Sequence, residues 1–116
     1  MSKIAVLLTC HNRCAKTRKC LMTLRNLFDK ENFEYEIHLT DDGCTDGTSE
    51  MVREMFPSAF IYYGQDLYWA GGMRMCWEGA IRKGGYDYYL LLNDDTYLKS
   101  NFVEDVRRSR RRYHYA

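Results

Sequence analysis

Two pairs of adjacent aspartates are the residues of this sequence best suited to chemistry. Asp41-Asp42 opens a turn-rich stretch, and Asp94-Asp95 follows the apolar run 88–92 with no glycine or proline to make a turn. Adjacent carboxylates in a cleft resist joint ionisation unless a cation offsets their charge. Hard oxygen ligands of this kind favour Mg²⁺ or Mn²⁺. The pairs therefore predict a divalent metal beside a phosphorylated ligand, with a purely structural role in backbone turns as the alternative.

The chain around these pairs alternates between strand and helix patterns. Residues 4–9 form a continuous apolar run typical of a strand covered on both faces, whereas residues 35–40 alternate polar and apolar side chains and predict a half-buried strand. The full set of expected elements is strands at 4–9, 35–40, 59–63 and 86–92, and helices at 15–29, 51–56, 73–81 and from residue 100 onward. This order is typical of an α/β fold with a mostly parallel sheet of about four strands and helices on both faces.

Ligands in such sheets bind beyond the carboxyl ends of the strands, so the strand ends are where a site is expected. Those ends fall at 9–13, 41–46, 64–69 and 93–96, and they bring both aspartate pairs to one edge. Within the second of them we expect Asp46 to cap the following helix.

The loop before the third helix offers further candidates. Gly71-Gly72 are expected to precede that helix and Arg74 to lie in its first turn, where backbone N–H groups and a guanidinium could face phosphate oxygens. The alternative is that the glycines only let the loop turn and Arg74 is a surface residue. Tyr68 and Trp69 either stack on a base or sugar or pack beneath the loop.

Composition and charge restrict the class of protein. A length of 116 residues with 28% charged residues fits one folded domain over residues 1–116, and no apolar run is long enough to span a membrane. The N-terminus lacks the pattern of a signal peptide, so a cytoplasmic location is expected. Five cysteines at irregular spacing predict reduced thiols rather than a zinc site.

A basic C-terminal segment stands apart from an otherwise acidic chain. Five arginines lie between residues 107 and 112. Nucleic acid is not expected as a partner, because this segment alone would have to support it. The arginines either make a peripheral contact with anionic lipid or form a solvated helix end.

Three segments resemble the signature segments of family 2 glycosyltransferases with the GT-A fold, in the family's order and at its spacing. They are Val6-Leu7-Leu8-Thr9-Cys10-His11-Asn12-Arg13, Asp41-Asp42-Gly43-Cys44-Thr45-Asp46-Gly47-Thr48 and Leu91-Leu92-Asn93-Asp94-Asp95-Thr96. The resemblance implies the N-terminal, nucleotide-sugar-binding half of such an enzyme. Two other classes are disfavoured by placement: a receiver-like signalling domain would need its acidic pair after the first strand, and a dinucleotide binder would need a glycine-rich turn there.

The resemblance also implies roles for individual residues. Thr9 would form the wall of the nucleotide pocket, Asp42 would accept the ring N–H of uracil or thymine, and Asp95 would hold Mg²⁺ or Mn²⁺ on the diphosphate. Asn93 stands at the first position of the family's Asp-x-Asp motif in place of aspartate. The full set of expected nucleotide-sugar-binding residues is Thr9, Asp41, Asp42, Gly72, Arg74, Asn93 and Asp94, with Asp95 as the metal ligand. His11 is expected at the pocket wall.

The implied reaction is metal-dependent transfer of a sugar, with inversion, from a UDP- or TDP-sugar to a hydroxyl of an acceptor sugar, lipid or polysaccharide. The family's general base lies downstream of the Asp-x-Asp strand, and about twenty residues follow Asp95 here. We therefore identify no catalytic residue and expect the acceptor-binding half to be absent. The alternative is a nucleotide-sugar-binding or assembly module without turnover. A sheet that ends so early would expose an apolar edge, which favours a homodimer.

Overall fold

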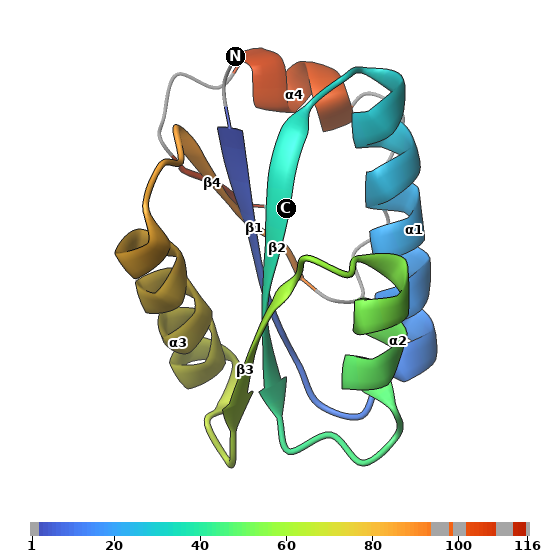
Figure 1. Cartoon of the computed structure of the whole chain (residues 1–116), viewed down its shortest axis with the longest axis vertical. Helices are drawn as coiled ribbons and strands as arrows, with labels where there is room; N and C mark the ends of the chain where they lie inside the picture. Colours follow the sequence, from blue (N-terminus) through green and yellow to red (C-terminus); the bar gives the residue numbers. More distant parts are fainter. Residues whose placement is uncertain (1–2, 94–97, 99–101, 109–112, 116) are drawn as a thin grey trace.

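The computed structural model describes residues 3–93, 98, 102–108 and 113–115. Strands and helices alternate along this part of the chain (Figure 1). In chain order the elements are β1 (Lys3–Cys10), α1 (Cys14–Lys30), β2 (Glu34–Asp42), α2 (Thr48–Met55), β3 (Phe60–Gly64), α3 (Tyr68–Lys83), β4 (Tyr88–Leu91), α4 (Phe102–Arg108) and β5 (Tyr113–Tyr115).

The strands of the described residues form one sheet in the order β3-β2-β1-β4-β5, and every neighbouring pair is parallel. Figure 1 shows α3 on one face of this sheet and α1 and α2 on the other. The predicted α/β class, parallel pairing and two-sided helix cover are confirmed. The sequence did not predict β5, because we expected one helix from residue 100 onward, whereas α4 ends at Arg108 and a short strand follows.

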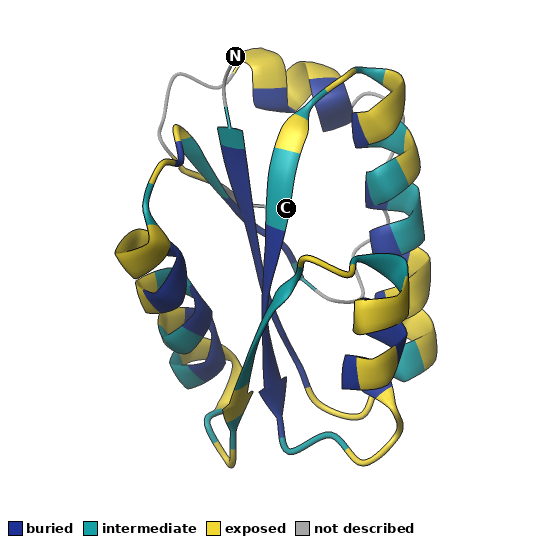
Figure 2. Ribbon diagram, viewed as in Figure 1, coloured by how far each residue is buried: buried dark blue, intermediate teal, exposed yellow. Residues whose placement is uncertain are grey.

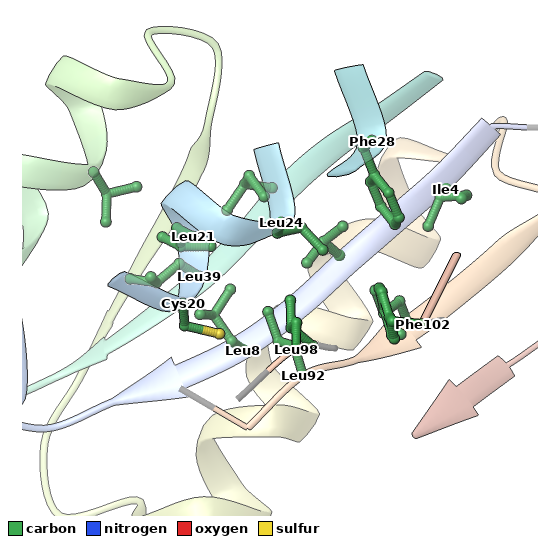
Figure 3. Close-up of a cluster of buried hydrophobic side chains, with 14 of the residues drawn as sticks. Ile4, Leu8, Cys20, Leu21, Leu24, Phe28, Leu39, Leu92, Leu98 and Phe102 are labelled. Carbon is green, nitrogen blue, oxygen red and sulfur yellow. The ribbon is translucent and has the colours of Figure 1, made fainter. Parts of the chain in front are cut away.

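The larger core lies between the sheet and α1, α2 and α4. Helix α1 buries Cys20, Leu21, Leu24 and Phe28, whose spacing of three and four residues puts them on one helix face. Figure 3 shows these side chains packed over Ile4 and other residues of the strands. Burial of a large apolar side chain contributes about 1.5–3 kcal/mol, so this face contributes several kcal/mol to stability.

The smaller core lies under α3, which buries Met73, Cys76 and Ala80 against Ala5 and Leu7 of β1. This second cover explains why residues of both β1 and β2 are buried on both faces in Figure 2. The expectation of a half-buried strand after residue 34 was wrong for its second half, since His38 and Thr40 are fully buried.

Buried His38 is satisfied by two tyrosines. Its Nε2 lies 2.7 Å from the Tyr86 hydroxyl and its Nδ1 lies 2.8 Å from the Tyr62 hydroxyl. Tyr86 donates its proton to Glu36 Oε1 at 2.5 Å, so it accepts from His38 Nε2–H, and Tyr62 donates to the unprotonated Nδ1. Burial lowers the pKa of His38 to about 4, which keeps the ring neutral at neutral pH.

The basic C-terminal segment is only partly described. Arg107 makes an ion pair at 2.9 Å with Glu31, the residue after α1, and lies over the Phe33 ring, so it joins α4 to the end of α1. Residues 109–112, with the remaining arginines after Arg108, lie outside the described residues. None of the helices in the described part of the chain is both long and apolar enough to span a membrane.

Candidate functional site

A cleft of about 380 Å³ lies at the carboxyl ends of the strands, where the sequence predicted a site. Four segments build it: the end of β1 with the loop after it, the end of β2, the start of α3 with the loop before it, and the residue that follows β4 by two positions. The lining residues are Thr9, Cys10, His11, Arg13, Asp42, Asp66, Tyr68, Trp69 and Asn93. Three predicted donor-binding residues, Thr9, Asp42 and Asn93, are therefore brought together.

Asp42 is the buried carboxylate of this cleft. It lies at the last position of β2, is 6% exposed, and pairs in register with Gly64 of β3. Its Oδ1 accepts the backbone N–H of Leu67 at 3.0 Å and its Oδ2 accepts that of Tyr68 at 3.0 Å. These amides belong to the residue before α3 and to the first residue of α3, which have no carbonyl partner within the helix, so Asp42 of β2 caps the helix. The Asp42 carboxylate therefore lines the cleft and also fixes the start of α3, whose residues Tyr68 and Trp69 line the cleft too.

Tyr68 has an unusual backbone conformation at this wall. Its φ of 59° lies in the left-handed region that bulky residues seldom adopt, and its side chain is 77% exposed. The bond from its N–H to Asp42 holds this conformation. Trp69 follows and is 42% exposed, so two aromatic rings of the wall face solvent rather than packing beneath the loop. Such rings can stack on a base or sugar.

Gly72 has a packing role in the structure rather than a place in the cleft lining. A β-carbon at Gly72 would lie 2.0 Å from Thr9 Oγ1 and 2.7 Å from Thr9 Cβ. Thr40 Oγ1 donates to the Gly72 carbonyl oxygen at 2.7 Å. Gly72 therefore lets α3 approach the ends of β1 and β2, and it supports the cleft wall through Thr9.

The predicted boundary of this helix was wrong. Helix α3 begins at Tyr68, so Gly71 and Gly72 lie inside it and Arg74 is beyond its first turn. Arg74 is exposed and lines a separate apolar groove of about 340 Å³, which shares Trp69 with the cleft. The structure does not bring Arg74 together with Thr9 and Asp42. Ile81, near the end of this helix, is 59% exposed and lines the same groove.

Asp41 points away from the cleft. Its Oδ1 accepts the backbone N–H of Cys44 at 2.8 Å, and its Oδ2 accepts the Ser49 hydroxyl. With 7% exposure, Asp41 fixes the turn after β2 and ties it to α2. The structure thus gives the two adjacent aspartates different surroundings.

Asp46 joins two helix starts, as expected of a capping residue. Its Oδ1 accepts the N–H and hydroxyl of Thr48 at the start of α2, and its Oδ2 accepts the Cys14 N–H at the start of α1 at 2.8 Å. The hydrogen bond from the Thr48 hydroxyl is the main cause of a lowered Asp46 pKa. This bonding supports the expected structural role and fixes the loops that border the cleft.

The polar lining includes residues outside the predicted donor-binding set. His11 Nδ1 lies 2.6 Å from the Asp42 carbonyl oxygen, which can only accept, so Nδ1 carries the proton and Nε2 is the unprotonated nitrogen of the neutral ring. Arg13 brings a fixed positive charge to the cleft and Asp66 a carboxylate. Both occupy strand-end segments, and that position was the signal that could have identified them.

Asp94 and Asp95 lie outside the described residues. Asn93, the residue before them, lines the cleft. Among the residues that are described, no group of three or more His, Cys, Asp and Glu side chains is placed to hold a metal ion. The predicted metal ligand Asp95 is not among these residues.

One of the comparisons with known proteins finds a family for this chain. The family described as Glycosyl transferase family 2 has a sequence profile that matches residues 5–113, a span that contains every residue lining the cleft. No curated protein and no solved structure gives a significant match. The family match covers nearly the whole chain. The chain therefore belongs to glycosyltransferase family 2.

Proposed function

We propose that the cleft binds the nucleotide diphosphate of a UDP- or TDP-sugar, with Asp42 accepting the ring N–H of uracil or thymine. The supporting observation is a buried carboxylate held at the cleft wall by two backbone amides in a chain of this family. A carboxylate offers about four acceptor positions, so the amides of Leu67 and Tyr68 leave capacity for one more donor. Cytosine has no proton at the corresponding ring nitrogen and would lose this contact.

The walls of the cleft suit the rest of such a donor. Arg13 supplies positive charge for phosphate oxygens, and the exposed rings of Tyr68 and Trp69 offer flat apolar surfaces for the base or the sugar. The Thr9 side chain also lines the cleft and lies close to Gly72 of α3.

A divalent metal is part of the proposal. Asp95 would hold Mg²⁺ or Mn²⁺ with Asp94 beside it, since paired carboxylates are the ligand type these ions prefer. The bound ion would offset the negative charge that develops on the diphosphate as the bond to the sugar breaks. Support comes from Asn93, which lines the cleft immediately before the pair in sequence.

The proposed reaction is transfer of the donor sugar to an acceptor hydroxyl. Asp42 is committed to the amides of Leu67 and Tyr68, so it is assigned to binding and not to deprotonation of an acceptor. Hydrolysis or transfer of a donor sugar by this chain would establish turnover. Binding without either reaction would identify a donor-binding module.

Calorimetric titration tests the proposal. UDP, TDP and CDP are titrated into the chain with Mn²⁺ and with a chelator, and the series is repeated for Asp95→Ala and Asp42→Asn. We expect metal-dependent binding of UDP or TDP that weakens at least tenfold in either variant, with CDP binding weakly throughout. Asp66→Asn is the matched control, because Asp66 lines the same cleft but is exposed. Equal affinity for CDP would overturn the role of Asp42, and binding that is unaffected by the chelator would overturn the metal.

A further inference from the structure

Cys10 and Cys44 lie against each other beside the cleft. Their Sγ atoms are 3.9 Å apart, and the Cys44 thiol also lies 3.4 Å from the Cys10 carbonyl oxygen. Both side chains are thiols in the structure. The sulfur atoms of a disulfide are about 2 Å apart, so these two would need to approach by a further distance of about 2 Å.

The backbone around the two thiols is already arranged for such an approach. Cys10 ends β1 and pairs in register with Asp41, which in turn accepts the Cys44 N–H. Asn12 crosses between the two loops, since its N–H points to Cys44 Sγ at 3.4 Å and its Oδ1 accepts the Thr45 N–H at 2.7 Å. The loops after β1 and β2 are therefore held side by side, and the two sulfur atoms lie 3.9 Å apart between them.

The two thiols differ in their exposure to solvent and therefore to a dissolved reagent. Cys10 is 2% exposed, whereas Cys44 is half-buried on the loop after β2. This combination matches the two roles of a disulfide-forming pair, in which one sulfur meets the oxidant and its neighbour resolves the adduct.

We propose that Cys10 and Cys44 are a site of reversible disulfide formation with low-molecular-weight disulfides such as oxidised glutathione. The Cys44 thiolate attacks one sulfur of the reagent, forms a mixed disulfide and releases the first small thiol. The Cys10 thiolate then attacks the Cys44 sulfur and displaces the second small thiol. Two protein thiols are oxidised and one reagent disulfide is reduced, and the two protein protons leave with the released thiols.

The disulfide would lie under the donor cleft. Cys10 stands between Thr9 and His11 and lines the cleft, and Cys44 follows Asp42 by two residues. A covalent bond here would fix the spacing between the end of β1, which carries Thr9, and the loop that follows Asp42. The inference stands on thiol geometry alone, so it does not require that the cleft binds a nucleotide.

The reaction should accelerate as the pH rises. Burial raises the pKa of the Cys44 thiol above that of an ordinary cysteine, so little of the attacking thiolate is present at pH 7. We expect the rate of disulfide formation to increase roughly tenfold per pH unit between pH 7 and 8, in proportion to the thiolate.

The test is incubation of the purified chain with oxidised glutathione, followed by alkylation of remaining thiols, intact mass measurement and peptide mapping. We expect loss of two hydrogens from the chain and a cross-linked peptide pair containing Cys10 and Cys44. Cys10→Ala should instead retain glutathione on Cys44, and Cys14→Ser is the matched control that should still form the disulfide. Circular dichroism confirms that each variant is folded.

The mapping of the unsubstituted chain decides the question even where a variant fails to fold. A stable glutathione adduct on Cys44, or a cross-link between Cys14 and Cys44, would overturn the proposal. A nucleotide titration of the oxidised chain is a separate measurement, so failure of donor binding would leave the disulfide assignment intact.

Discussion

Gly72 allows the sharpest test of how α3 supports the cleft. In Gly72→Ala the new methyl group would lie 2.0 Å from Thr9 Oγ1 and 2.7 Å from Thr9 Cβ. Rotation of the Thr9 side chain can move the hydroxyl oxygen, but it cannot move Cβ, which is fixed by a central strand of the sheet. Helix α3 must therefore shift away from β1, and the part of the cleft wall formed by the start of α3 shifts with it.

The expected change in the free energy of unfolding of Gly72→Ala follows from two opposing effects. Replacing glycine by alanine inside a helix stabilises it by about 1 kcal/mol, while overpacking a core contact costs about 1–3 kcal/mol. The contact with Thr9 Cβ places Gly72→Ala at the upper end of that range, so we expect a net loss of about 2 kcal/mol. For a domain of this size such a loss lowers the melting temperature by roughly 8–10 °C.

The neighbouring glycine supplies a matched control. Gly71→Ala receives the same gain in helix propensity, but its new methyl group would lie 3.2 Å from Leu67 Cβ and would require a shift of only a few tenths of an ångström. We expect Gly71→Ala to change the free energy of unfolding by no more than about 1 kcal/mol, in the stabilising direction. The two variants should therefore differ by about 2–3 kcal/mol.

Urea denaturation followed by circular dichroism measures this difference. The double variant Thr9→Ala/Gly72→Ala should recover part of the loss, since it removes Oγ1 but leaves the Cβ contact at 2.7 Å. Equal stability of Gly71→Ala and Gly72→Ala would refute the packing role of Gly72.

Two further predictions concern buried polar groups. Asp42→Asn should destabilise the fold by about 2 kcal/mol in the same assay, because its single amide oxygen can replace only one of the two acceptors held by backbone amides, while exposed Asp66→Asn should stay within about 0.5 kcal/mol. His38 has a folded-state pKa of about 4, below that of unfolded histidine, so the unfolded chain takes up the proton first as the pH falls. The free energy of unfolding should therefore decrease between about pH 6.5 and pH 4 by up to about 3 kcal/mol; His38→Gln should flatten this decrease, and exposed His11→Gln should retain it.

Apolar periodicity was sufficient to predict most of the elements that carry the site. The run at residues 4–9 and the helical spacing in residues 15–29 correspond to β1 and α1 within one or two residues. The burial of His38 could not be read the same way, because a histidine between Ile37 and Leu39 looks like the outer face of a half-buried strand. Its burial depends on partners 24 and 48 residues away, the hydroxyls of Tyr62 and Tyr86.

The start of α3 was missed for a similar reason. A helix start is recognised in sequence by a local capping side chain, and Leu67, the residue before this helix, makes no such bond. The cap comes instead from Asp42, 25 residues earlier in the chain. Because this cap is distant in sequence, the local pattern assigned Tyr68 and Trp69 to a loop and placed the two glycines before the helix.

Asp41 and Asp42 have different surroundings because of the geometry of the strand that carries them. Successive side chains of a strand point to opposite faces, and β2 continues through both residues. Only one of the two can therefore face α3 and the cleft, and the other must face α2, where it bonds to Cys44 and Ser49. The sequence showed that two carboxylates lie at the end of a strand. Predicting which of them faces the cleft required knowledge of the helix that covers each face of the sheet. The two adjacent aspartates therefore have separate roles: Asp42 lines the cleft, and Asp41 fixes the turn that follows the strand.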